Sequence, residues 1–137
     1  MAAQPRSELQ ELVDAPNETL AVEYKSWLDL NENASRADLA RHIAALANHG
    51  GGHISFGFDD QMQYSGPTTY TGFTIDRDLI SGIVRKYLEP PFQCDVHVIM
   101  STVGHEHPVI VIPPHGAAPI CYARLDRVPS GTNEGLR

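Results

Sequence analysis

The sequence predicts an α+β fold in a single domain, with a mixed β-sheet and helices mainly on one face. Three observations predict this class. Several short stretches alternate apolar and polar residues, as half-buried strands do. Between the first of these strand-like stretches lie longer stretches whose apolar residues have helical spacing. A chain of 137 residues can bury one hydrophobic core but is short for two. The expected order is βαβα followed by three strands.

The N-terminal part, residues 1–17, is predicted to be a short helix and a linker. Leu9 and Leu12 lie three residues apart, as on one face of a helix, and Asp-Ala-Pro-Asn at residues 14–17 ends the pattern. Residues 18–137 are predicted to form the rest of the domain.

The strongest helix signal covers residues 35–47. Ser35 followed by Asp38 resembles a capping box, and an apolar stripe then runs to a cluster of glycines. This helix separates two stretches with strand-like alternation, residues 22–28 and residues 54–58. The first half of the domain is therefore predicted to be strand, helix, strand.

The second half begins with another helix, for which Asp76 is a candidate N-cap and Pro90 a stop. Residues 95–103 and 108–112 are then predicted to form a hairpin, and residues 120–125 a further strand. Together these stretches supply the remaining strands of the mixed sheet.

The apolar runs, the N-terminus and the cysteines bear on the cellular location of the protein. Its longest apolar run, residues 108–114, is far shorter than the roughly 20 residues that span a bilayer, and the N-terminus lacks the pattern of a signal peptide. Cys94 and Cys121 have neither metal-ligand nor redox spacing. We therefore expect no membrane segment, a cytoplasmic location and buried, reduced thiols.

The formal net charge of −7 bears on function, because phosphate backbones attract clustered Lys and Arg. An acidic chain is expected to bind nucleic acid weakly by itself. A local basic strip, a bound divalent cation or a partner domain would offset the repulsion.

Acidic residues on the first two strands are candidates for a catalytic site. Side chains alternate along a strand, so Glu23 and Lys25 share one face, and Asp59 is expected to join them if both strands bury their apolar sides against the helices. Glu18 would reach them from the preceding turn. Converging carboxylates could bind Mg²⁺ or Mn²⁺ as a metal site, and Lys25 could neutralise charge on a phosphate. The alternative is an ordinary solvated strand face.

The glycine-rich junction after the strongest helix has two interpretations. Asn48, Gly50 and Gly51 could cradle a phosphate or nucleotide, or the glycines could simply end the helix. The sequence is not a Walker loop, because no Lys-Ser or Lys-Thr follows. His105 and His107 are interpreted as a polar hairpin turn rather than a metal pair.

Taken in order, these motifs resemble one family, the Schlafen-type AlbA-like domain. Its pattern is E-x4-EFK, a helix ending AFANT-GG, and an IGV-DD strand. Residues 18–25, 44–52 and 53–60 are similar to these motifs, and residues 110–113 and 127–133 match the closing strands more loosely. The chain departs from the pattern in Tyr24, which replaces Phe, in His49, which replaces Thr, and in one extra glycine.

The resemblance implies association with nucleic acid, often as a module attached to regulatory domains. Some members of the family are metal-dependent RNases that cut structured RNA such as tRNA through three carboxylates. By position these fall on Glu18, Glu23 and either Asp59 or Asp60. The candidates for contact with nucleic acid or phosphate are Lys25, Asn48, Gly50, Gly51 and Arg127.

Three functional hypotheses follow. The preferred one is a nucleic-acid-binding regulatory module for RNA or DNA, because a fold does not by itself transfer chemistry. The alternatives are a metal-dependent endoribonuclease and a nucleotide-binding or small-ligand domain. A homodimer is also predicted, with the apolar run at residues 109–112 as the candidate pairing edge.

Overall fold

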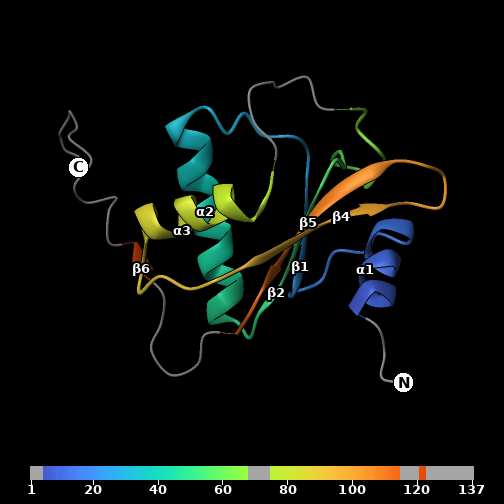
Figure 1. Ribbon diagram of the computed structural model, residues 1–137. Helices are drawn as coiled ribbons and strands as arrows, with labels where there is room; N and C mark the ends of the chain where they lie inside the picture. The colour runs from blue at the N-terminus through green and yellow to red at the C-terminus, as the bar shows by residue number, and fades with distance from the viewer. Residues whose placement is uncertain (1–4, 68–74, 115–120, 123–137) are drawn as a thin grey trace.

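The computed structural model describes residues 5–67, 75–114 and 121–122. Its helices and strands, coloured along the chain in Figure 1, are α1 (Pro5–Asp14), β1 (Val22–Lys25), α2 (Asn33–Asn48), β2 (Gly52–Phe56), α3 (Arg77–Tyr87), β3 (Leu88–Glu89), β4 (Asp95–Met100), β5 (Glu106–Ile112) and β6 (Cys121–Tyr122).

A mixed four-stranded sheet with the order β1-β2-β5-β4 forms the centre of the fold. Strands β1 and β2 are parallel, whereas β5 is antiparallel to both β2 and β4. The predicted α+β class and the predicted hairpin are confirmed. The last predicted strand does not join the central sheet, because β6 pairs with the short β3 in a separate two-stranded sheet. The sequence did not reveal β3, which has only two residues.

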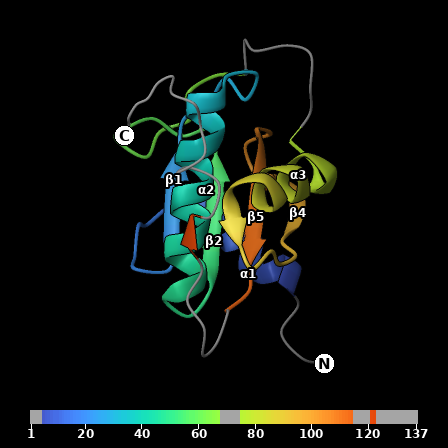
Figure 2. The ribbon, with the colours of Figure 1, turned by 90° about the vertical axis from the view of Figure 1, so that its left-hand side faces the viewer.

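Helices cover both faces of the sheet unequally. Figures 1 and 2 show α2 and α3 together on one face and α1 on the other. The larger core cluster joins α2 and α3 to β2 and β5, through residues that include Leu39, Ile43, Ile54, Phe56, Ile80, Ile83 and Ile110. The smaller cluster lies under α1 and contains Leu9, Val13, Val22, Tyr24, Phe58, Ile99 and Val109. The N-terminal helix therefore packs as part of the domain.

Both faces of the sheet are thus covered by apolar side chains. The side chains of β1 project to the opposite faces from those predicted. Glu23 is paired in register with Ile54, and Lys25 with Phe56. Residues paired side by side in a sheet project to the same face, so Glu23 and Lys25 project towards the α2–α3 side. Tyr24 faces α1 instead. The prediction that Glu23 and Lys25 lie opposite Ile54 and Phe56 was wrong, because alternation gives only the relative phase of a strand.

A bulge ends β2 two residues earlier than the sequence suggests. The N–H groups of Gly57 and Phe58 both donate to the carbonyl of Lys25, at 2.8 and 3.1 Å. Gly57 has a φ of 96°, and a Cβ there would lie 2.9 Å from Nδ1 of His107. Because of the bulge, Phe56 belongs to the larger core cluster and Phe58 to the smaller one.

His107 is a buried strand residue rather than part of a polar turn. Its Nδ1 lies 2.8 Å from the carbonyl oxygen of Phe56. A carbonyl can only accept, so Nδ1 carries the proton. The ring stacks on Phe58 with centroids 4.3 Å apart. His105 does lie in the turn region, stacked on Tyr64 at 3.6 Å.

The helix ends show where capping was predicted correctly. Asp76 caps α3 by accepting the N–H of Leu79 at 2.9 Å, as expected. Helix α2 begins at Asn33, two residues before the predicted Ser35, and its N-cap Glu32 makes no side-chain capping bond.

Two further predictions concern thiols and membrane spans. Cys94 is free and buried, and burial raises the pKa of its thiol to about 12. The side chain of Cys121 lies outside the described residues. Across residues 5–67, 75–114 and 121–122, no helix is both long enough and apolar enough to cross a membrane.

Candidate functional site

A cleft of about 290 Å³ opens beside β1 and the segment that follows β2. The residues lining it include Glu18, Glu23, Lys25, Asp59 and Asp60, the residues proposed as catalytic from the sequence. The structure therefore brings these residues to one place, although Glu23 and Lys25 project from the opposite sheet face to the one predicted.

The single lysine of this group is already held by an acidic side chain. Nζ of Lys25 lies 3.7 Å from Oδ2 of Asp38 on α2, and only 13% of the Lys25 side chain is exposed. Four carboxylates and one paired lysine make the cleft electronegative. A phosphodiester would be repelled there unless a cation bridged it.

Asp59 has a structural role that separates it from Asp60. Its Oδ1 accepts the backbone N–H groups of Gln61 and Gln63, at 2.8 and 3.0 Å. This is an Asx-type turn that fixes the loop after β2. Asp60 is exposed.

The predicted Mg²⁺ or Mn²⁺ site stays a prediction, and the spacing of its candidate ligands bears on it. Among the residues that the structure describes, no three His, Cys, Asp or Glu side chains are grouped closely enough to hold a metal ion. Glu18, Glu23 and Asp59 share the cleft without converging on one point. The arrangement does not fit a three-carboxylate metal centre, and no catalytic step through a metal follows from it.

The glycine-rich junction lies outside the cleft. The N–H of His49 and that of Gly51 donate to the carbonyl of Leu46, at 3.1 and 2.8 Å, and the N–H of Gly50 donates to Ala47 at 3.4 Å. These N–H groups close the end of α2, so they offer no open cradle for phosphate. Asn48 is the exposed last residue of the helix.

Only glycine fits at the next position, Gly52, because the backbone of Ala21 lies so close that a Cβ would overlap its carbonyl oxygen. Arg127, the remaining candidate for contact with nucleic acid, lies outside the described residues.

Comparison with known proteins shows to which family the chain belongs. The model of the family described as "Schlafen, AlbA_2" matches residues 18–128. This chain belongs to the Schlafen AlbA_2 family. The resemblance stated from the motifs is thereby confirmed. No match is found among curated proteins.

A solved structure similar to this Schlafen AlbA_2 chain is the N-terminal domain of a putative ATP-dependent DNA helicase RecG-related protein from Nitrosomonas europaea. The two share 14% sequence identity, over 85% of each chain, with a TM-score of 0.45.

The departure of this Schlafen AlbA_2 domain at Tyr24 has a structural explanation. The Tyr24 hydroxyl donates to the carbonyl of Leu12 in α1 at 2.8 Å and lies 3.4 Å from the N–H of Asn17. Phe would lose both contacts. The hydroxyl therefore connects β1 to the end of the N-terminal helix, and burial raises its pKa.

Sequence reasoning missed a second hollow on this Schlafen AlbA_2 domain, which we call the α3 groove. It measures about 370 Å³ and is lined by Ser81, Arg85, Pro91, Phe92 and Gln93, so it lies between α3 and the segment after β3. The signal that could have revealed it is a four-residue repeat.

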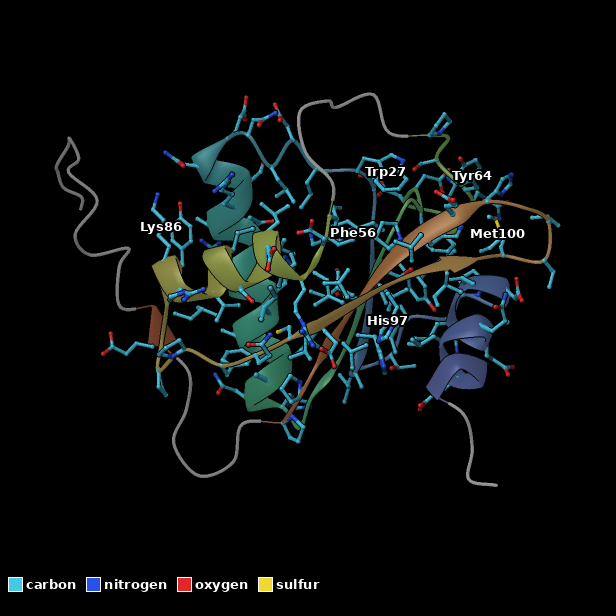
Figure 3. The ribbon with its side chains drawn as sticks, viewed as in Figure 1. Trp27, Phe56, Tyr64, Lys86, His97 and Met100 are labelled. Atoms are coloured by element: carbon cyan, nitrogen blue, oxygen red, sulfur yellow. The ribbon has the colours of Figure 1, made fainter. Side chains whose placement is uncertain are left out.

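Arg77, Ser81 and Arg85 are spaced four residues apart along α3, which places them along one side of the helix. Arg77 is paired with Asp95 at 2.9 Å, whereas Arg85 has no ion-pair partner in the described part of the chain. Lys86 projects from the same end of α3 (Figure 3).

Proposed function

We propose that this Schlafen AlbA_2 domain is a nucleic-acid-binding regulatory module for RNA or DNA. The observation that carries the proposal is the family match, which covers residues 18–128 and fits a role related to nucleic acid. The homodimer predicted from the sequence is likewise a proposal.

Charge and shape favour the α3 groove over the acidic cleft as the binding surface. Arg85 is an exposed cation in the groove. On the opposite wall, Gln93 adds an exposed amide, and Phe92 adds an aromatic ring that is partly exposed and partly packed against the larger core cluster. A cation for phosphate oxygens beside a ring for a base is the combination that binds single-stranded nucleic acid without sequence preference.

A metal-dependent endoribonuclease is the second candidate, because the carboxylates predicted for it line one cleft together with Lys25. The lack of a three-ligand group among the described residues weighs against it. Less supports the nucleotide-binding hypothesis, because the N–H groups of the glycine-rich junction after α2 are bonded within the fold.

The proposal is tested by incubating the protein with labelled structured RNA, single-stranded RNA and duplex DNA, with Mn²⁺ or with a chelator. We expect salt-sensitive binding, intact nucleic acid in every lane, and the same result for Glu23→Ala. Absence of binding to all three probes at low salt would reject the module. Cleavage that needs Mn²⁺ and disappears in Glu23→Ala would establish the nuclease instead.

A further inference from the structure

Strand β4 is an edge of the central sheet, and no strand in the described part of the chain pairs with its outer side. The N–H of Ser101 donates to the carbonyl of His105, which sets the direction of the backbone groups in the hairpin. Because this direction alternates along a strand, Val96, Val98 and Met100 present their N–H and C=O groups to the outside. In agreement, Nε2 of Gln10 in α1 donates to the Met100 carbonyl at 2.7 Å.

The same three residues form an apolar row on one sheet face. Val98 is 53% exposed and Met100 50% exposed, while Val96 packs partly against the larger core cluster. Figure 3 shows Met100 at the hairpin end of the strand, close to α1. An edge strand with exposed apolar side chains and unpaired backbone groups favours pairing with another strand.

The other edge of the sheet is better protected. Strand β1 has only four residues and carries the charged side chains of Glu23 and Lys25. Strand β4 has six residues, with neither proline nor lysine among them. Since proline, lysine and short length are the usual means of blocking an edge, β4 is the edge open to pairing.

We propose that β4 pairs antiparallel with β4 of a second copy of this chain about a twofold axis at Val98. The sheets of the two copies then form one continuous sheet. Val98 lies opposite its own counterpart, and Val96 lies opposite Met100 of the second copy. Every outward N–H and C=O of the three residues gains a partner, since a carbonyl oxygen can accept a second bond beside that from Gln10.

The self-complementary sequence is the reason for choosing a second copy as the partner. An antiparallel pair centred on Val98 brings the two apolar rows together on one face, without placing a charged side chain in either row. The charge of Asp95, at the beginning of the strand, is already paired with Arg77. A twofold arrangement also closes after two copies, so it leaves no free edge at β4.

This arrangement replaces the edge expected from the sequence. The apolar run at residues 109–112 lies in β5, a central strand with neighbours on both sides. Val109, Ile110 and Ile112 are almost completely buried. They belong to the core, so the prediction that this run forms the pairing edge was wrong.

Light scattering at tens of micromolar protein tests the pairing. We expect the wild type at twice the 15.0 kDa mass of one chain and Val98→Asp at the mass of one chain. Val103→Asp is the matched control, because Val103 is 74% exposed but lies in the hairpin turn beyond β4. A wild type with the mass of one chain, or equal masses for the two variants, would overturn the proposal.

A cysteine at the axis tests the register and does not depend on a destabilised variant. In a directly hydrogen-bonded antiparallel pair the Cα atoms lie about 5.5 Å apart, a separation that a disulfide can bridge. Val98→Cys should form a disulfide-linked dimer under mild oxidation, whereas Val103→Cys and the wild type should not. Equal cross-linking of both variants would reject the Val98 axis.

Discussion

The imidazole of His107 fills a gap that Pro108 leaves in the sheet. Proline has no N–H, so the carbonyl of Phe56 at the end of β2 lacks a donor from β5, and Nδ1 of His107 provides one at 2.8 Å. The ring is 1% exposed, and Phe58 stacks on it. Neither contact could be predicted from the sequence, because both depend on the bulge at Gly57, which changes the face to which Phe58 projects.

Burial of imidazoles predicts a stability that depends on pH. Desolvation lowers the pKa of His107 and that of His53 below the ordinary value of 6.5. The unfolded chain therefore binds more protons than the folded chain just below pH 6.5, and the folded state loses stability as the pH falls from 6.5 towards the lower pKa values. Denaturant unfolding from pH 7.5 to 5 should show this loss.

His107→Phe separates the contribution of His107 from that of the other groups. The variant should be less stable at neutral pH by about 1–3 kcal/mol, because the Phe56 carbonyl loses its donor. It should also lose less stability than the wild type between about pH 6.5 and pH 5. The same acid-induced loss in both proteins would contradict the assignment to His107.

At the scale of elements, the sequence predicted the existence and order of most helices and strands. Alternating and helical spacings are local properties, and they identified α1, α2, α3, β1, β2 and the β4–β5 hairpin. Boundaries were less accurate, since the bulge at Gly57 and the early start of α2 at Asn33 depend on contacts with other elements. The absolute face of β1 was missed because helices cover both sides of the sheet.

The two helix N-caps offer a matched pair of substitutions. Asp76→Ala should lower the free energy of unfolding by about 1 kcal/mol, because the Leu79 N–H loses its side-chain acceptor. Glu32→Ala removes a side chain that makes no capping bond and should change stability much less. Chemical denaturation of the two variants checks this difference. Equal losses would contradict the role assigned to Asp76.

At the scale of the whole molecule, unlike charges occupy different surfaces. Carboxylates gather in the cleft beside β1, whereas Arg85 and Lys86 extend from α3. The gathering of Glu18, Glu23, Lys25, Asp59 and Asp60 was predicted from the spacing of motifs and from family resemblance. The α3 groove was not predicted, because it depends on how the segment after β3, Pro91 to Gln93, packs beside α3.

Binding of nucleic acid at the α3 groove is tested by the affinity for a fluorescent single-stranded RNA at low salt, measured by anisotropy for the wild type, Arg85→Glu and Lys86→Glu. The two variants change the charge equally at adjacent positions, but only Arg85 lines the α3 groove. We expect that the wild type binds, that Arg85→Glu weakens binding about tenfold or more, and that Lys86→Glu has a much smaller effect. Equal weakening by both variants would contradict the groove as the binding surface, and a wild type that does not bind would contradict the nucleic-acid-binding function itself.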